Sequence, residues 1–283
     1  MKGNIFDLNK IRIEISFKSY EELRLKLSFL LNQNFNKINI PCKNNLKNDF
    51  LLNSIKISRE EFPSIDIIPH FSILNEFKRN RNNTLNSFIQ FLNSVKSFGC
   101  NEVLLVSGSQ KRSTLDSIST LSYLKDNTNL STSDFSIGVA FNPYLSCDYF
   151  EEEIIKLEKK LQSGFVKSIW IQFGTDCDLL ESRIETIKKT ILLSNKNKTI
   201  TSNVKLFGSV LIPSKQFLAR FKFRPWKGVY CSNEFLESVG FARNLVCNIL
   251  QTYEKYDICP IIETDVSTEE KLNSLLDILE NNF

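Results

Sequence analysis

Short apolar runs alternate with longer stretches of helical periodicity along the whole chain. The short runs are rich in β-branched and aromatic residues, which is typical of strands. The predicted strands are 11–17, 37–41, 65–71, 102–106, 135–141, 168–173, 204–212 and 258–262. The clearest helical patterns lie at 20–31, 85–98, 150–161, 179–193, 234–253 and 269–279. This alternation predicts repeated βα units around a parallel sheet.

Several predicted helices begin with a polar residue that suits an N-cap. Ser19 and Glu22 have the spacing of a capping box, in which each side chain satisfies a free backbone amide. Ser267 and Asp178 stand at equivalent positions before two later helices. We therefore expect helices to start at these three places.

Eight strand–helix pairs in 283 residues give about 35 residues per unit, which fits a (β/α)8 TIM barrel of the α/β class. A doubly wound open sheet is the alternative, since it produces the same alternation. No G-x-G-x-x-G follows the first strand and no G-x-x-x-x-G-K-[ST] occurs, which disfavours a nucleotide-binding open sheet. No linker divides the chain, so we expect one barrel domain over residues 1–283.

Charge and composition restrict the class of partner. The 36 basic and 32 acidic residues leave a net charge of +4 that is spread along the chain, so no nucleic-acid partner is expected. No apolar run approaches the roughly 18 residues of a membrane span, and the first residues do not resemble a signal peptide. We expect a cytoplasmic protein that does not bind membranes.

Metal-ligating residues are sparse. The seven cysteines form no C-x-x-C pair, and there is a single histidine. Neither a zinc site nor a disulfide framework is therefore predicted.

Polar residues inside buried strands need a reason, and Glu14 is the sharpest case. Alternation in strand 11–17 places Ile13 and Ile15 on one face and Arg12 and Glu14 on the other. If the apolar face meets the helices, Glu14 points into the barrel near its C-terminal end. The alternative is a glutamate at an exposed strand end or paired with Arg12.

Three other polar positions fall at the C-terminal ends of predicted strands. Gln172 shares a strand face with Trp170, and His70 ends the third strand. The turn 107–109, Ser-Gly-Ser, follows the fourth strand and could bring backbone amides close to a ligand. The alternatives are a hydrogen-bonded structural histidine and an ordinary tight turn. Because TIM barrels carry their active sites at this end, the coincidence favours a functional site.

These residues are also where the sequence resembles the methylenetetrahydrofolate reductases, flavin-dependent (β/α)8 enzymes of folate metabolism. The segment 13–17, Ile-Glu-Ile-Ser-Phe, stands where the family has a Phe-Glu-Phe strand, which implies that Glu14 is the general acid that opens the folate ring. The segment 68–72, Ile-Pro-His-Phe-Ser, is similar to the family's Pro-His-Leu-Thr and places His70 against the flavin. The segment 102–109 matches a strand that ends in Leu-Arg-Gly-Asp.

Two later segments extend the resemblance. The helix ending at Gly164 is similar to one whose lysine contacts the flavin phosphates, which implies that role for Lys160. The segment 171–176, Ile-Gln-Phe-Gly-Thr-Asp, resembles Thr-Gln-Phe-Phe-Phe-Asp and makes Gln172 the amide that binds folate and nicotinamide in turn.

The sequence also departs from the family pattern. Ser107 and Ser109 replace the flavin-contacting arginine and the pterin-binding aspartate, and Phe141 stands where the family has the tyrosine of Tyr-Pro-Glu. These changes leave a second hypothesis open, a diverged barrel that binds folate without flavin redox activity, or a flavin-free folate-dependent enzyme.

The resemblance implies a specific reaction. FAD, reduced by NADH or NADPH, would pass a hydride to 5,10-methylenetetrahydrofolate and give 5-methyltetrahydrofolate. Desolvation of Glu14 in an apolar mouth favours its protonated form, which suits a proton donor. The expected partner is thus a small folate substrate, with a homo-oligomer left open.

Overall fold

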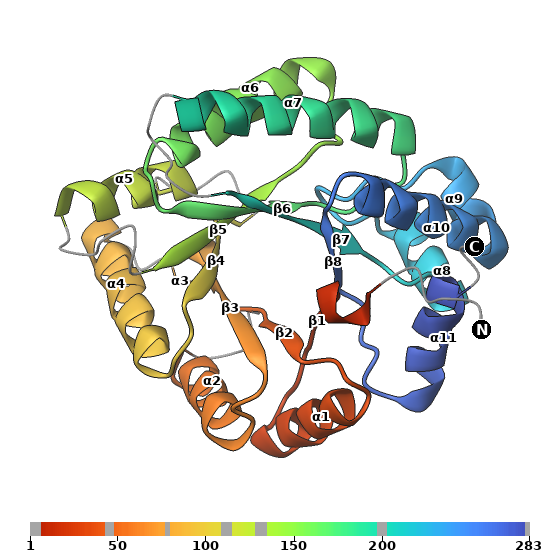
Figure 1. The fold of residues 1–283 in the computed structure, drawn as a ribbon, viewed down its shortest axis with the longest axis horizontal. Helices are drawn as coiled ribbons and strands as arrows, with labels where there is room; N and C mark the ends of the chain where they lie inside the picture. Colours follow the sequence, from red (N-terminus) through yellow and green to blue (C-terminus); the bar gives the residue numbers. More distant parts are fainter. Residues whose placement is uncertain are drawn as a thin grey trace.

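The computed structural model describes residues 7–42, 48–76, 80–108, 115–127, 135–196 and 203–280. Eight parallel strands close into a barrel in sequence order, with β1 paired to both β2 and β8. The strands are β1 Arg12–Glu14, β2 Lys37–Ile40, β3 Asp66–Ser72, β4 Glu102–Val106, β5 Ser136–Phe141, β6 Val166–Ile171, β7 Lys205–Val210 and β8 Cys259–Ile262. Figure 1 looks into this ring. The predicted (β/α)8 barrel is confirmed, and the open sheet is excluded because β1 and β8 pair.

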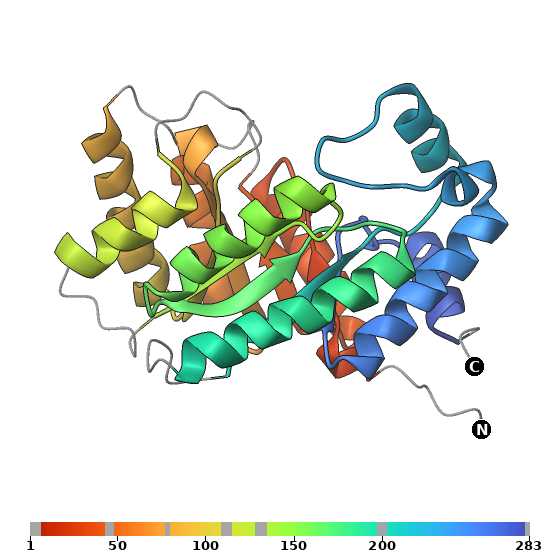
Figure 2. The ribbon, with the colours of Figure 1, turned by 90° about the horizontal axis from the view of Figure 1, so that it is seen from above.

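Helices surround the barrel on its outer side, and Figure 2 shows them from above. They are α1 Tyr20–Asn32, α2 Asn48–Glu61, α3 Ile73–Glu76, α4 Arg81–Ser97, α5 Ser117–Asn127, α6 Cys147–Leu161, α7 Cys177–Lys196, α8 Lys215–Phe223, α9 Asn233–Glu237, α10 Val239–Lys255 and α11 Glu269–Glu280. A short 3-10 helix, η1 Leu8–Lys10, precedes β1.

Helix α2 escaped prediction because its buried face is partly polar. Ser54 and Ser58 are buried beside Leu51 and Ile55, which dilutes the apolar periodicity. Their hydroxyls donate to the carbonyls four residues earlier, at 2.7 Å in both cases. A serine satisfied in this way can occupy a buried helix face without leaving an unpaired polar atom.

The first two predicted N-caps differ in outcome. Ser19 caps α1 as expected, with its Oγ accepting from the Glu22 amide at 3.1 Å. Asp178, in contrast, lies inside α7. The cap of that helix is Asp176, whose Oδ1 accepts from the amide of Leu179 at 2.9 Å.

Two further helix predictions are wrong. The Ser267 hydroxyl donates to Asp265 instead of capping the last helix, which begins at Glu269. The predicted helix 234–253 is divided into α9 and α10 at Ser238, which is extended and accepts from the Phe241 amide at 3.2 Å.

Strand alternation creates two separate apolar cores. Outward residues such as Ile13, Ile38 and Phe71 belong to a large core shared with the helices. Inside the barrel a second cluster consists of Ile68, Leu104, Trp170, Phe207 and Ile261. Trp170 stacks on Phe207 at 4.2 Å between ring centroids. Gly138 makes room for the indole, since a Cβ there would lie 2.3 Å from its nitrogen.

This inner cluster separates two polar ends of the barrel. Toward the start of the strands, the inward positions are Lys37, Asp66, Glu102 and Lys205. Toward the C-terminal ends, which we call the mouth, they include Glu14, His70, Gln172, Ser209 and Glu263. The apolar layer therefore keeps the two polar ends chemically distinct.

Candidate active site at the mouth of the barrel

The mouth brings Glu14 and His70 together. Glu14 is the last residue of β1, and His70 lies near the end of β3, two strands away. The Glu14 Oε2 is 4.0 Å from the His70 Nδ1, and their side chains are 15% and 9% exposed. The glutamate thus points inward, and Arg12 pairs with Asp66 at 2.6 Å.

A buried hydrogen-bond chain holds His70 from the other side. The Nε of Arg12 donates to Oδ1 of Asn39 at 2.7 Å, and both side chains are buried. The Nδ2 of Asn39 lies 2.8 Å from Nε2 of His70. The ring of His70 also meets Trp170 edge-on at 6.2 Å.

Donor and acceptor chemistry fixes the direction of this chain. A guanidinium can only donate, so the oxygen of Asn39 must face Arg12. The amide nitrogen then faces His70, and because it too can only donate, Nε2 must carry the lone pair. The proton of the neutral imidazole therefore sits on Nδ1, which faces Glu14.

A second set of predicted residues lines one cavity of about 560 Å3. Ser107, Lys160 and Gln172 all contribute to it, at the ends of β4 and β6 and from α6. Ser109 lies outside the described residues. Its lining also includes Asp116, Glu153, Lys156 and Lys227.

Ser107 anchors the start of α5 at the edge of this cavity. Its hydroxyl accepts a hydrogen bond from the backbone amide of Ser117, the first residue of α5, at 2.9 Å. The following residue, Gly108, has a φ of 87° and packs so closely on Leu74 that a Cβ would lie 2.4 Å from that side chain. The turn is therefore a tight connection that anchors α5.

Lys160 is buried, with its ammonium group turned toward the protein. The Nζ donates to the carbonyl of Ala140 at 3.0 Å and lies 3.8 Å from the Glu153 carboxylate. Burial lowers the pKa of Lys160, and the Glu153 charge opposes that effect. The ammonium is thus already compensated within the fold.

Gln172 lies at the mouth of the barrel, whereas Phe141 lies on its outer side. The backbone N–H of Gln172 donates to the Phe141 carbonyl at 2.9 Å, and the Gln172 side chain is half-buried at the cavity wall. Phe141 is fully buried on the outer side of β5, edge-on to Phe150 at 6.0 Å. The substitution at 141 therefore changes the outer core and not the mouth.

Sequence reasoning missed three polar residues of this region. Period-2 alternation places Asn39 on the inward face of β2. Glu263 comes directly after the last residue of β8, at the strand end where Glu14 lies in β1. Both residues could therefore have been identified from the sequence pattern. The Oε1 of Glu263 accepts from the Ser209 hydroxyl at 2.5 Å. Asp116 precedes α5, a helix that was not predicted.

Asp116 places a charged group in the cavity. Its Oδ1 accepts from the Ser119 amide at 2.8 Å. Burial acts to raise the pKa of Asp116, but the hydrogen bonds from Ser119 outweigh it and the pKa is lowered. The carboxylate therefore stays ionised at neutral pH.

Metal and membrane features are absent from the part of the chain that the structure describes. No three His, Cys, Asp or Glu side chains gather there as a metal-binding group. In the same residues, no helix combines the length and the apolar character needed to cross a membrane.

Comparisons by sequence identify no relative: no protein-family model matches the chain, and no curated protein matches it. Solved structures do resemble it. One is an uncharacterized protein from Clostridium thermocellum that binds two copies of 5-methyl-5,6,7,8-tetrahydrofolic acid. It superposes with a TM-score of 0.61 over 96% of this chain and 94% of its own, at 10% sequence identity.

Two other structures are more distant. An aldo/keto reductase from Klebsiella pneumoniae in complex with NADP and acetate has a TM-score of 0.50 and 8% identity, covering 95% of this chain and 85% of its own. A dihydropteroate synthase from Coxiella burnetii in complex with pteroic acid has a TM-score of 0.49 and 11% identity, covering 96% of this chain and 92% of its own. At these identities, the likenesses with TM-scores of 0.61 and 0.50 show the barrel fold alone.

Proposed function

We propose that the protein is a folate-dependent enzyme that binds a reduced folate at the mouth of the barrel, with Glu14 as the proton donor. The observation that carries this proposal is the meeting of Glu14 with an imidazole whose proton is directed toward it. The structural likeness to a 5-methyltetrahydrofolate-binding protein over nearly the whole chain supports the ligand class.

The chemistry of the mouth suits a ring-opening step. A methylene bridge between two folate nitrogens must open to an iminium before it can accept a hydride, and opening requires a proton on one nitrogen. Glu14 gives that proton and becomes a carboxylate. The N–H of His70, 4.0 Å away, then stabilises the new negative charge after a small movement of either side chain.

The finer proposal is the reaction of methylenetetrahydrofolate reductases, in which NADH or NADPH reduces methylenetetrahydrofolate to 5-methyltetrahydrofolate. A bound FAD would supply the hydride there, because no side chain can. Gln172, at the wall of the 560 Å3 cavity, would hold the pterin or nicotinamide through its amide.

The residues that the resemblance assigns to the FAD phosphates are engaged within the fold. The Ser107 hydroxyl accepts from the Ser117 amide, and the Lys160 ammonium donates to the Ala140 carbonyl. Lys156 and Lys227 also line the cavity, but Lys156 and Lys160 each lie 3.8 Å from the Glu153 carboxylate, which reduces the positive charge offered to phosphate. These contacts favour, as the second candidate function, a folate-dependent barrel that works without flavin.

The deciding experiment is the visible absorption spectrum of the purified protein before and after incubation with FAD, together with calorimetric titration of 5-methyltetrahydrofolate. Bound flavin that NADH or NADPH bleaches and methylenetetrahydrofolate restores would establish the reductase. A colourless protein that binds the folate would establish the flavin-free candidate. Absence of saturable folate binding would refute both.

A further inference from the structure

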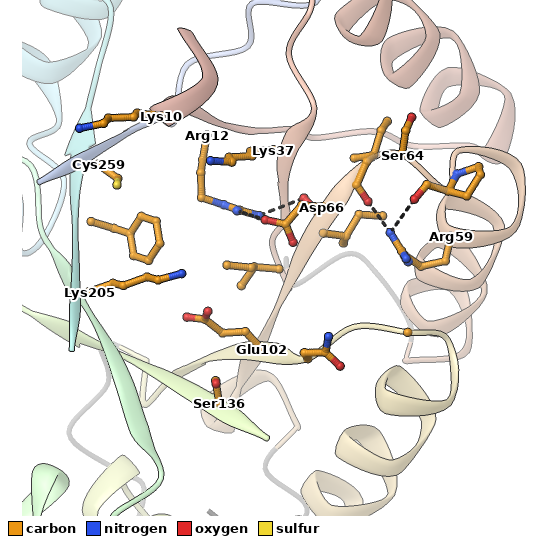
Figure 3. Close-up of a pocket in the computed structure, with 17 residues that line it drawn as sticks. Lys10, Arg12, Lys37, Arg59, Ser64, Asp66, Glu102, Ser136, Lys205 and Cys259 are labelled. Carbon is orange, nitrogen blue, oxygen red and sulfur yellow. Dashed lines mark hydrogen bonds and ion pairs between the residues drawn. The ribbon is translucent and has the colours of Figure 1, made fainter. Parts of the chain in front are cut away.

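The end of the barrel opposite the mouth contains a second cavity, of about 580 Å3, shown in Figure 3. We call it the N-terminal cup. The first inward residues of four strands, Lys37, Asp66, Glu102 and Lys205, line it. Inward positions of TIM barrels are usually filled by branched apolar side chains, so a charged layer at this level is unusual.

Most charges of the cup have a partner. Arg12 bonds Asp66 at 2.6 Å, with its side chain only 3% exposed. Arg59 donates to the carbonyls of Ile65 and Phe98. The Arg12 charge is therefore compensated by Asp66, whereas Arg59 keeps its positive charge and directs its donors to backbone carbonyls.

Two ammonium groups of the cup lack such bonds. Lys37 and Lys205 begin β2 and β7, which are separated in the ring by β1 and β8, and both side chains extend into the cup (Figure 3). Across the described ranges, neither forms a hydrogen bond or an ion pair. Like charges held in one concave space repel each other unless an anion lies between them.

Several lysines of the cup act on one thiol, that of Cys259. Lys10, Lys37 and Lys205 all act electrostatically on the thiol of Cys259, although burial is stronger and raises the pKa of that thiol. Lys10 is also paired with Asp257 at 3.3 Å. Burial raises the pKa of Glu102, and a hydrogen bond from Ser168 and the charges of Arg12 and Lys205 act in the opposite direction.

We propose that the N-terminal cup binds a small phosphate-bearing anion between Lys37 and Lys205. Lysine binds phosphate as a point charge, whereas carboxylates are matched best by the fork of arginine. Arg12 is bonded to Asp66 and Arg59 directs its donors to backbone carbonyls, so the groups left to meet the anion directly are lysines, which favours phosphate over carboxylate. Ser136, whose side chain also lines the cup, offers a hydroxyl donor.

The cup is independent of the proposed folate site. The inner cluster that contains Trp170 and Phe207 lies between them. Loss of phosphate binding would leave folate binding at the mouth untouched, and the reverse also holds. Failure of either proposal can therefore be recognised separately.

The test is a calorimetric titration of the full chain with inorganic pyrophosphate, with ionic strength held constant by sodium chloride. We expect saturable binding at one site, together with a higher thermal midpoint. The double variant K37M/K205M should bind at least about tenfold more weakly. A double variant of exposed lysines elsewhere, K125M/K222M, should bind as the original protein does.

Two further measurements keep the proposal open to refutation. If K37M/K205M does not fold, K205M alone can be tested, because Lys205 is exposed at the start of its strand. We expect K205M to bind pyrophosphate more weakly than the original protein, by a smaller factor than the double variant. E102Q should bind pyrophosphate more tightly, because it removes a carboxyl group that interacts electrostatically with Lys205. No saturable heat, equal binding by K37M/K205M, or equal binding of citrate would overturn the assignment.

Discussion

The amide nitrogen of Asn39 lies 2.8 Å from Nε2 of His70, and this contact determines which nitrogen of the imidazole carries the proton. Arg12 holds the amide oxygen at 2.7 Å, so the amide cannot be turned around without breaking a buried charge-assisted bond. The only histidine of the chain thereby presents an N–H to Glu14.

The tautomer of His70 can be measured directly, because a single histidine gives one set of ring signals. In 15N NMR of the ring we expect Nε2 to give the resonance of an unprotonated nitrogen and Nδ1 that of a protonated one. In N39D a carboxylate oxygen replaces the amide nitrogen, so Nε2 should become protonated. N93D, at an exposed position of α4, should leave the ring signals unchanged. A protonated Nε2 in the neutral original protein would contradict the hydrogen-bond chain.

The role of Glu14 is tested by E14Q, which keeps the shape of the side chain and removes its proton. We expect folate turnover to fall by about 100-fold or more, while folate binding changes little. If the protein binds flavin, reduction of the flavin by NADH or NADPH should persist. Turnover in E60Q, at an exposed position of α2, should match that of the original protein. Full turnover by E14Q would exclude Glu14 as the acid.

Gly208 is required by the packing of α10 on β7. A Cβ at this position would lie 2.2 Å from the ring of Tyr253, whose hydroxyl donates to the Ser209 carbonyl at 3.1 Å. We expect G208A to lower the free energy of unfolding by about 1–3 kcal/mol or more, measured by urea denaturation.

The matched control is G240A in α10. The nearest atom to a Cβ at Gly240 is 3.8 Å away, so the methyl group meets no obstacle. Alanine favours the helix over glycine by about 0.5–1 kcal/mol, so this variant should gain stability. Equal effects of the two substitutions would show that contact with Tyr253 is not the cause.

Glu102 should make stability depend on pH in an unusual direction. Burial raises its pKa above the ordinary 4.5, so the folded state holds this proton more tightly than the unfolded state. The penalty for ionising Glu102 is absent below pH 4.5 and grows as pH rises through its folded pKa. The free energy of unfolding of E102Q, relative to the original protein, should therefore increase with pH over that range.

Asp265 provides the opposite sign as a control. Burial acts to raise its pKa, but hydrogen bonds from Ser267 and Lys271 outweigh that effect and lower the pKa to about 2. Its contribution to stability is present above the ordinary value of 3.8 and is lost as pH falls toward 2. D265N should thus lose stability at neutral pH and approach the original protein in acid. The same pH trend for E102Q and D265N would contradict these assignments.

The sequence by itself determined the architecture. Apolar alternation with period 2 located all eight strands to within a few residues, because the two faces of a buried strand are set by neighbours along the chain. The same local rule placed Glu14 on the strand face opposite Ile13 and Ile15, and the contact with His70 shows that this face points inward. Helices with partly polar buried faces, such as α2, were missed because serines satisfied by their own backbone interrupt the apolar stripe.

Only the tertiary structure decided which polar residues meet. Arg12, Asn39 and His70 are separated by 27 and 31 positions along the chain, and closure of the barrel places them in hydrogen-bond contact. Ser107 illustrates the same limit, since its hydroxyl serves the start of α5 ten residues later. Strand periodicity fixes the direction of each side chain, but contacts across the barrel depend on the register between strands, which no single strand encodes.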